Sequence, residues 1–428
     1  MAGEYWKDRA PQAANLRLLC IKEGWKCFVD RLAADGKTVE EVGSASLVES
    51  ALLNALNATS VLVLAGAGAS LSAANPTNKT NAPTMYDLWL AVIQAVGEDV
   101  FGQVLAQFQY AAIDRNIEKL LSLCKIHLEL YEKAEEDDET KALVTEFINV
   151  AEKAILKRVD FVGSDTNLDA HSEFIRKIGR RGVRKPRAKF FTTNYDLCFE
   201  EAARRQRFVI IDGFSHSLDQ TFDRSHFDYD VVRRESMKET PDYLANVFHL
   251  YKLHGSVDWR RINGEIVRSR AEVGAPALIY PRSSKYQEAF EPPYLDMMGA
   301  FQAALREPDA ALIISGFGFN DDHISRPVIA ATEANLSLRL IVCDPTFIRS
   351  DEDLLADHHV VSDNTAPDNE FLARLHALAI AGDARIHLAN GRFSDLAAAL
   401  PDPIGETDRE RHANRIRALR DVTGSTPR

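Results

Sequence analysis

Four short, largely apolar runs constrain the fold of this chain more than any other feature. They cover residues 61–64, 189–191, 311–315 and 338–343. Runs without polar alternation are typical of parallel strands that are buried on both faces of a sheet. Segments with apolar residues at helical spacing lie between the runs, as right-handed βαβ crossovers require. The sequence therefore predicts an α/β fold built on a parallel sheet.

The segment from about residue 86 to 160 differs in composition from the rest of the chain. It is rich in Leu, Ala, Glu and Lys and contains no convincing strand pattern. Its acidic run at 135–139 is typical of a solvated helix face or of a helix-helix connection. We expect an inserted helical subdomain there.

The remaining sequence is divided into three parts. Residues 1–45 are predicted to form a helical extension, because the apolar residues of 16–32 follow an amphipathic pattern. A core helix and a helix that contacts a partner would both explain that pattern. Residues 46–400 are predicted to hold the sheet, closed by the late segments RIHL and FSDLAAAL, and residues 401–428 to form a tail.

Net charge and hydropathy argue against two classes of partner, nucleic acids and membranes. The formal net charge of −12 argues against a general nucleic-acid-binding surface, so we expect no direct nucleic-acid binding. We interpret a local basic run as a solvated helix end and loop; it comprises Arg180, Arg181, Arg184, Lys185, Arg187 and Lys189. No segment approaches the roughly 20 apolar residues of a membrane span. We therefore expect a soluble, cytoplasmic protein with no membrane contact.

The cysteines indicate neither a disulfide framework nor a cysteine zinc site. They are odd in number and scattered, with no C-x-x-C pair, at Cys20, Cys27, Cys124, Cys198 and Cys343. The two histidines of DHH (357–359) are adjacent, so their side chains would point to opposite faces of a strand and in different directions on a helix. We therefore predict no metal site there.

A glycine turn follows the first apolar run. GAGAS (66–70) would let backbone N–H groups approach a pyrophosphate without an intervening Cβ, and a following helix would direct its positive end at the anion. The third glycine of a dinucleotide fingerprint is missing, because position 71 is Leu. Alone, this turn fits a structural role as well as a nucleotide site.

Three further stretches place polar residues beyond predicted strands, where open α/β sheets collect ligands. They are FFTTNYD (190–196), YKLHGSVDW (251–259) and LIISGFGFNDDHI (312–324). In the last stretch, Asn320 or Asp321 can cap a helix, which explains the acidic pair and His323 without a metal.

In this order, GAGAS, TTNYD, LHGS and GFGFNDDHI resemble the sirtuin family, and specifically the divergent bacterial sirtuin-like branch of anti-phage defence proteins. DRNIEKLLS (114–122), YPRSSKYQEAF (280–290) and VCDP (342–345) support the resemblance, which covers about residues 55–400. It implies a Rossmann-like sheet that binds NAD, with a smaller inserted domain over the cleft.

The resemblance also implies roles for individual residues. Asn194 and Asp196 would flank the nicotinamide and its ribose, and His254 would act on that ribose. The predicted NAD-binding residues are Gly66, Ala67, Gly68, Ser70, Thr193, Ser315, Gly316, Gly318 and Asp344. No basic pair accompanies Asp344 to receive a 2′-phosphate, which favours NAD over NADP.

Cleavage of the bond between nicotinamide and ribose requires the same residue types. Nicotinamide is a neutral leaving group, so cleavage of its bond to ribose needs no general acid. It needs groups that hold the carboxamide and a base for a ribose hydroxyl or for water, and a neutral histidine suits the base. Each residue also has a structural alternative: His254 as a hydrogen-bonded core residue and Asn194 as an Asx-turn that ends a strand.

The chain departs from deacetylating sirtuins in ways that change the expected acceptor. It lacks their two zinc-binding C-x-x-C pairs, so no zinc is expected; it has Thr193 in place of a glutamine, and SAANPTNKTNAP (72–83) in place of P-D-F-R. Without a peptide channel, water becomes the acceptor and the products are nicotinamide and ADP-ribose. The resemblance thus implies an NAD hydrolase that depletes NAD in abortive-infection defence.

Such an activity must be restrained, so we expect control by a partner. The resemblance suggests a homo-oligomer that assembles with a HerA-type hexameric ATPase. Three alternatives remain open: a protein deacylase or ADP-ribosyltransferase that uses the same cleft, a non-catalytic sensor of NAD or ADP-ribose, and a scaffold for an ATPase or nuclease.

Overall fold

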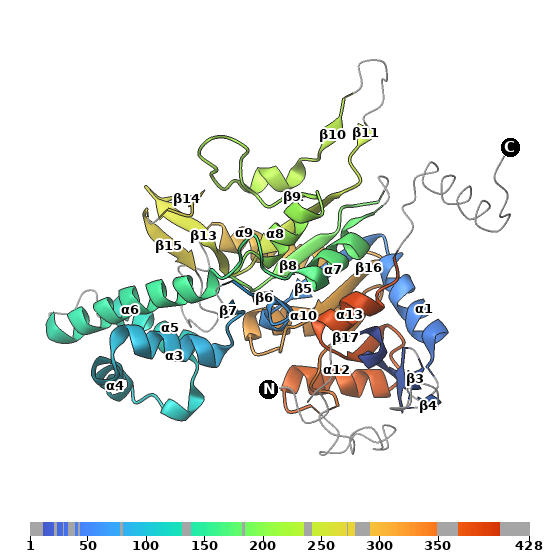
Figure 1. Cartoon of the computed structure of the whole chain (residues 1–428), viewed down its shortest axis with the longest axis horizontal. Coiled ribbons are helices and arrows are strands. Elements are labelled where there is room, and N and C mark those ends of the chain that lie inside the picture. Colours follow the sequence, from blue (N-terminus) through green and yellow to red (C-terminus); the bar gives the residue numbers. More distant parts are fainter. Residues whose placement is uncertain are drawn as a thin grey trace.

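A computed structural model shows a central twisted sheet with helices on both faces and two smaller units at one side (Figure 1). The structure describes residues 12–20, 24–28, 30–32, 39–41, 43–77, 80–130, 138–181, 185–234, 242–271, 273–278, 292–348 and 367–402. Within these residues the main sheet has nine strands, in the order β2-β1-β18-β17-β16-β5-β8-β12-β9.

Seven neighbouring strands of this sheet are parallel, which confirms the α/β, Rossmann-like fold class. They are β5 (Ser60–Ala65), β8 (Lys189–Thr192), β9 (Val209–Ile211), β12 (Val247–Lys252), β16 (Ala310–Ser315), β17 (Arg339–Cys343) and β18 (Ile386–Asn390). All four apolar runs form strands, and every residue of β5 and β16 is buried. The absence of polar alternation thus reflects burial on both faces.

Successive residues of β5 contribute to two different cores. Val61 and Val63 belong to one cluster, with the helices α1 (Ala45–Leu56), α7 (Asp169–Gly179), α8 (Cys198–Arg205) and α13 (Phe393–Ala399). Leu62 and Leu64 belong to the other, with α9 (Tyr294–Ala304), α10 (Asp322–Ala334) and α12 (Glu370–Ile380). The sheet is therefore the middle of three layers, and its strand ends are the places left open to a ligand.

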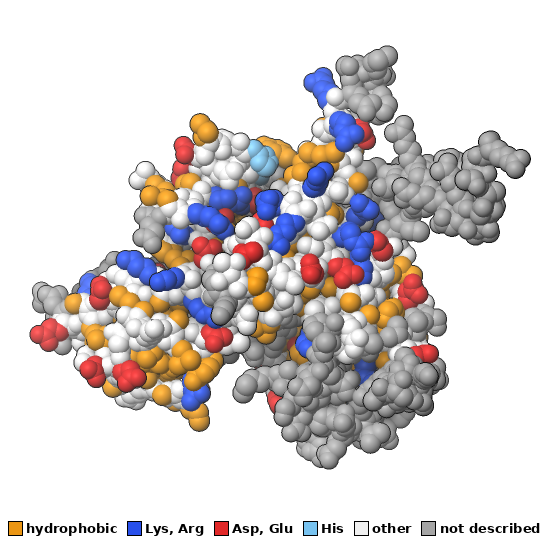
Figure 2. All heavy atoms as spheres, in the orientation of Figure 1, with side chains coloured by type: hydrophobic (Ala, Val, Ile, Leu, Met, Phe, Trp, Pro, Cys, Tyr) orange, Lys and Arg blue, Asp and Glu red, His pale blue; other side chains and the backbone are white. Residues whose placement is uncertain are grey.

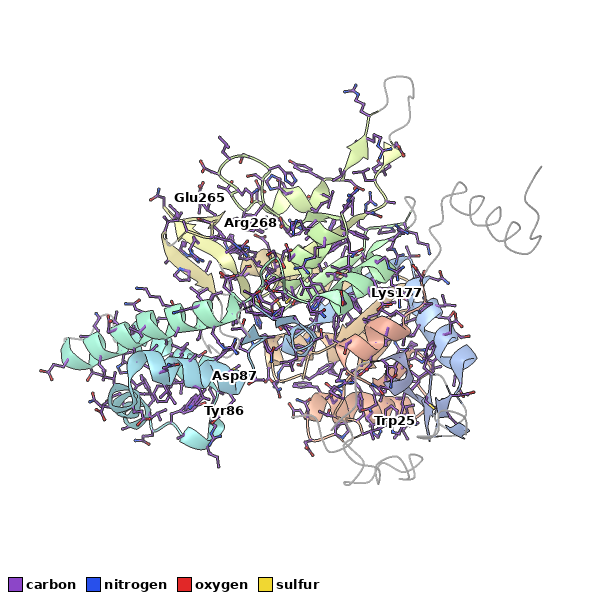
Figure 3. The ribbon with its side chains drawn as sticks, viewed as in Figure 1. Trp25, Tyr86, Asp87, Lys177, Glu265 and Arg268 are labelled. Atoms are coloured by element: carbon purple, nitrogen blue, oxygen red, sulfur yellow. The ribbon has the colours of Figure 1, made fainter. Side chains whose placement is uncertain are left out.

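Apart from the short 3-10 helix η2 (Ala13–Asn15), the regular elements in the described part of the N-terminal segment are strands, so the prediction of a helical extension over residues 1–45 is wrong for those strands. β1 (Arg17–Cys20) pairs antiparallel with β18 and with β2 (Gly24–Cys27), and β3 (Arg31–Leu32) pairs with β4 (Val39–Glu41). Burial alternates along β2, with the side chain of Trp25 (labelled in Figure 3) buried. The Trp25 ring lies 5.7 Å from that of Phe347. This period of two matches a strand at a sheet edge. Residues 1–11 lie outside the described part.

The stretch expected to be a helical insert contains α3 (Met85–Val96), α4 (Glu98–Gln107), α5 (Ile117–Leu130) and α6 (Asp138–Val159), and no strand lies among its described residues. Thr84 and Asp87 form a capping box at the start of α3 (Figure 3). Trp89 and Phe101 pack edge to face at 4.9 Å inside the unit. Apolar side chains gather on its outer surface, including Tyr86, Leu90 and Ile113 (Figure 2).

No single described helix is long and apolar enough to cross a membrane. The pair α3 and α4, bent by 112°, meets the requirement only by combined length and composition.

A second unit follows β12 directly. β13 (Gly255–Ile262), β14 (Glu265–Arg268) and β15 (Ala275–Leu278) form a three-stranded antiparallel sheet. β10 (Val232–Arg233) and β11 (Asp242–Tyr243), which precede β12, form a separate pair (Figure 1). Trp259 is buried there against Phe214 and Phe222. Because β13 starts where β12 ends, both units meet at the strand ends of the main sheet.

The basic run has a structural role that charge patterning did not predict. Arg181 is buried and donates to the backbone carbonyls of Leu56, Ala58 and Thr59. Arg187 is also buried and pairs with Asp230. The interpretation as a solvated helix end is therefore wrong for these two arginines; Arg184 lies outside the described residues.

Candidate functional site

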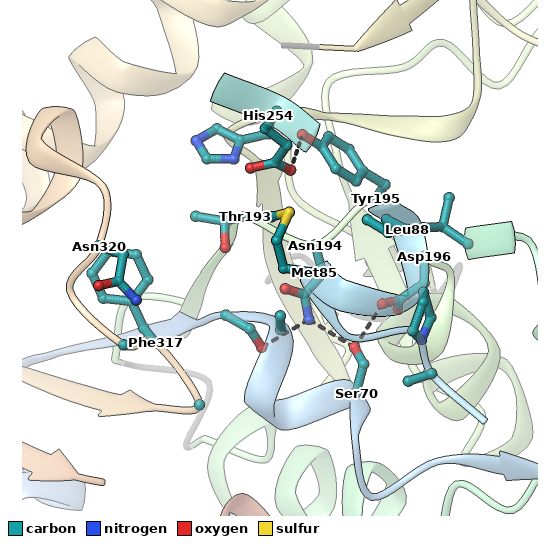
Figure 4. Close-up of a pocket in the computed structure, with 18 of the residues that line it drawn as sticks. Ser70, Met85, Leu88, Thr193, Asn194, Tyr195, Asp196, His254, Phe317 and Asn320 are labelled. Atoms are coloured by element: carbon teal, nitrogen blue, oxygen red, sulfur yellow. Dashed lines mark hydrogen bonds between the residues drawn. The ribbon is translucent and has the colours of Figure 1, made fainter. Parts of the chain in front are cut away.

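A cavity of about 420 Å³ opens at the carboxyl ends of β5, β8, β12 and β16 (Figure 4). The helical insert covers one side of it, through side chains that include Met85, Leu88 and Glu118. The predicted site residues that line it are Gly66, Ala67, Ser70, Thr193, Asn194, Asp196, His254, Gly316 and Gly318. Four sequence-distant motifs therefore meet at one place, as parallel strand ends require.

Two glycine turns form one wall of the cavity by direct backbone contact. The Gly68 N–H donates to Gly316 O at 2.9 Å. A Cβ on Gly66 would lie 2.6 Å from that same oxygen, and a Cβ on Gly68 would lie 2.7 Å from Gly316 Cα. Gly316 itself has φ +68°, which favours glycine. The glycines thus let the β5 and β16 turns touch and leave backbone facing the cavity.

The helix after the first turn is shorter than expected. α2 (Ala67–Ser70) is a single turn, and Leu71 follows it half exposed. A helix of one turn supplies less macrodipole than the longer helix expected after this turn. The absence of side chains at Gly66, Gly316 and Gly318 on the cavity wall remains the feature that suits a phosphate.

Asn194, Ser70 and Asp196 form a connected chain of buried polar groups (Figure 4). Asn194 Nδ2 donates to Gly66 O at 2.9 Å and to Ser70 Oγ at 2.7 Å. Ser70 Oγ donates in turn to Asp196 Oδ2 at 2.6 Å. The amide of Asn194 therefore reaches across to the β5 turn, and the Asx-turn alternative does not describe it. Asp196 makes that turn instead, since its Oδ1 accepts from the Cys198 N–H at 2.9 Å.

His254 lies between β12 and β13 and is 7% exposed. Its Nε2 lies 2.9 Å from Asp321 Oδ2. Asp321 caps α10, as expected, with Oδ1 accepting from the His323 N–H at 3.1 Å. The contact with His254 was not predicted, because the two residues come from different strand ends and only the fold brings them together.

Lys252 braces the loop that carries Asn194 and Asp196. This buried lysine of β12 donates to the backbone oxygens of Tyr195, at 3.3 Å, and of Asp196, and it pairs with Glu200 at 2.9 Å. Burial raises the pKa of Glu200, and the neighbouring Lys252 opposes that rise. The sequence signal for a role of Lys252 was its position as a lysine in a strand that is otherwise predicted to be buried.

The helical insert contacts the same loop. Tyr195 Oη donates to Glu118 Oε1 at 3.0 Å, and Glu118 belongs to α5 (Figure 4). Asn116 also lines the cavity, at the start of that helix. The DRNIEKLLS stretch therefore reaches the site, although none of its residues was predicted to bind a ligand.

Three predicted NAD-binding residues lie elsewhere. Gly68 packs on Gly316, Ser315 is buried in β16, and neither lines the cavity. Asp344 follows β17 and accepts from the N–H of Thr346 at 2.8 Å. Burial raises the pKa of its carboxyl. The Asp344 carboxylate therefore bonds within its own turn and does not line the cavity.

In the part of the chain that the structure describes, no three His, Cys, Asp or Glu side chains are grouped as metal ligands. The DHH segment lies outside that part.

Comparison with known proteins identifies a sirtuin-like region. Residues 188–359 match the family model of the SIR2-like domain, a range that runs from β8 past β17 and includes Asn194, His254 and Asp321. SIR2-like domains bind NAD, so the match supports NAD-related activity in general terms. The first glycine turn and the helical insert lie outside the matched range. No curated protein sequence matches the chain.

Proposed function

We propose that the cavity binds NAD and hydrolyses the bond between nicotinamide and ribose, which releases nicotinamide and ADP-ribose. The observation that carries the proposal is the convergence of Asn194, Asp196 and His254 on one cavity within a SIR2-like region.

The glycine wall supports the position of the diphosphate. Gly66 and Gly316 present backbone where any Cβ would collide with the opposite turn. Phosphate oxygens can approach such a wall closely because no side chain stands in front of it. The N–H groups of Gly66 and Gly68 already donate to the carbonyl oxygens of Ser315 and Gly316. Gly318 and Asn320, on the same loop, extend the polar lining.

The reaction needs one bond broken and one formed. The C1′–N bond breaks, and its electron pair stays on the ring nitrogen of the departing, now neutral nicotinamide. A water oxygen bonds to C1′, and His254 accepts the proton of that water or of a ribose hydroxyl. Asn194 and Asp196, held by Ser70, position the carboxamide and the ribose. The net products are nicotinamide, ADP-ribose and one proton.

The helical insert favours water as the acceptor. It supplies Met85, Leu88 and Glu118 to the cavity wall, and these side chains occupy space beside Asn194 and His254. The Tyr195–Glu118 hydrogen bond links this insert to the loop of Asn194. A partner that moves the insert would therefore move the reactive loop.

We extend the proposal to biological role. NAD depletion of this kind would serve abortive-infection defence against phage, with the chain acting as a homo-oligomer under the control of a HerA-type hexameric ATPase. The resemblance of the ordered motifs supports this extension, and the exposed apolar side chains of the insert, Tyr86, Leu90 and Ile113, are available for assembly.

The test is nicotinamide release from NAD, followed by chromatography, for the protein alone and with a HerA-type ATPase. His254→Ala and Asn194→Ala should each lower the rate by about 100-fold or more. His216→Ala, at an exposed position, is the matched control and should keep the wild-type rate. Binding of NAD without cleavage under both conditions would replace the hydrolase by a sensor.

A further inference from the structure

We propose that Asp321 is a positioning residue for His254, whose carboxylate holds the imidazole with Nε2 protonated and so leaves Nδ1 to accept the proton. This inference rests on the proposed NAD hydrolysis and adds a residue to it.

The two oxygens of Asp321 have separate surroundings. Oδ1 accepts from the His323 N–H and caps α10. Oδ2 is buried, receives no aligned hydrogen bond from the described residues, and lies 2.9 Å from His254 Nε2. Contacts in catalytic sites are often poorly aligned before a substrate binds. The short distance makes the imidazole the natural donor to Oδ2.

Both side chains are shielded from water. The His254 side chain is 9% exposed and that of Asp321 is 7% exposed. A carboxylate removed from water is costly unless a donor or an opposite charge compensates it. A helix cap alone needs no charge, since Asn and Ser cap as well as Asp. The helix N-terminus and the imidazole of His254 both compensate the carboxylate at position 321.

The loop that carries Asp321 is held in an unfavourable conformation. Phe319 has φ +55° and is fully buried. Asn369 Nδ2 donates to its carbonyl oxygen at 3.0 Å, which anchors the loop from α12. Such strain persists only where the surroundings enforce it, and it marks segments that place a side chain. Here the next polar residues are Asn320 and Asp321, both of which line the cavity.

The pairing has a direct chemical consequence. A neutral imidazole that donates from Nε2 keeps its lone pair on Nδ1. No described residue bonds to Nδ1, so this nitrogen can receive a proton from water or a ribose hydroxyl. The imidazolium that forms is stabilised by the Asp321 carboxylate, and the proton does not pass to Asp321.

The kinetic test replaces the charge and keeps the cap. Asp321→Asn should lower kcat for nicotinamide release by about 100-fold, with KM within about twofold and an unchanged melting temperature because Asn still caps α10. Asp322→Asn, one residue further along the same helix start, removes an exposed carboxylate that pairs with Arg326 and should leave kcat unchanged. An Asp321→Asn protein with wild-type kcat overturns the inference.

A spectroscopic test does not depend on turnover. Nitrogen-15 NMR of histidine-labelled protein, with His254 assigned from His254→Gln, should show the Nε2–H tautomer in the wild type. Asp321→Asn should shift His254 toward a mixture of tautomers. A wild-type His254 with the proton on Nδ1 overturns the inference. If the wild type binds NAD but releases no nicotinamide, the proposed function fails, while the tautomer still decides the pairing.

Discussion

Ser70 Oγ donates to Asp196 Oδ2 at 2.6 Å while it accepts from Asn194 Nδ2. One hydroxyl thus joins the turn after β5 to the loop after β8, and it fixes the orientation of both polar side chains. Ser70 is itself 3% exposed, so water cannot replace it easily.

We expect Ser70→Ala to weaken both the fold and the reaction. The loss of the hydroxyl leaves Asp196 Oδ2 without its donor, which costs about 1–3 kcal/mol in the free energy of unfolding. Nicotinamide release should fall as well, because Asn194 loses one of its two acceptors. Urea unfolding and the nicotinamide assay measure the two effects. A variant as stable and active as wild type would show that the hydroxyl does not hold the loop.

Gly316→Ala should be the more damaging of two glycine substitutions with positive φ. Its Cβ would lie 2.2 Å from Ala69 N in addition to the strain of φ +68°. Gly382→Ala, at φ +99° with open space around its Cβ, carries strain alone and is the control. We expect a loss of roughly 1 kcal/mol for Gly382→Ala and of several for Gly316→Ala. Equal losses in urea unfolding would mean that the turns separate without cost.

Lys252→Met tests whether Lys252 stabilises the loop that carries Asn194 and Asp196. Removing one partner of a buried ion pair costs about 3–5 kcal/mol, and the lower end applies because the Glu200 side chain is 23% exposed. Since burial already raises the pKa of Glu200, stability should fall as pH rises from the ordinary carboxyl value through that raised pKa. Loss of the lysine should steepen this fall. Unfolding measured from pH 4 to 8 checks it, and an unchanged pH profile would exclude the pairing.

His171 should make the fold sensitive to acid. Burial lowers its pKa to about 4, which the nearby Asp196 opposes, and its ring packs on Phe199 and Phe393. The unfolded chain binds this proton near pH 6.5, so stability should be full above that pH and should fall by roughly 1.4 kcal/mol per unit as pH drops toward 4.

His171→Leu should remove the contribution of His171 to the fall in the free energy of unfolding with decreasing pH. His249→Leu offers an independent comparison, because burial also lowers the pKa of His249 to about 4. Chemical denaturation at pH 4.5, 5.5 and 7 distinguishes the variants from wild type. A slope that His171→Leu does not change would mean that the ring is already protonated in the folded protein.

The strands of the sheet interior were predictable because their burial on both faces leaves unbroken apolar runs. β5, β16 and β17 were located within one or two residues for this reason. β1 and β2 were not, because strands of four residues carry too few positions to separate a period of two from helical spacing. The order of the sheet, by contrast, depends on tertiary contacts that local pattern does not encode.

The site was predictable where motifs follow strands. Asn194, Asp196 and His254 line one cavity as expected. Asp321 and Lys252 were missed as site residues, because each acts through a contact that exists only after β12, β8 and β16 are aligned. Asp344 lies outside this cavity, and its Oδ1 accepts from the Thr346 N–H within its own turn, a contact that the strand pattern did not indicate.

The pairing of β1 with β18 matters for any shortened form of this protein. β1 covers the free edge of β18, and Asn15 Nδ2, just before β1, donates to Asp395 Oδ1 at 2.9 Å. A shortened protein that began at α1 would present β18 as an open edge, ready to pair with strands of other molecules. The N-terminal strands thus cover β18 and move this edge of the sheet to β2, a strand of only four residues, at the opposite side of the sheet from β9.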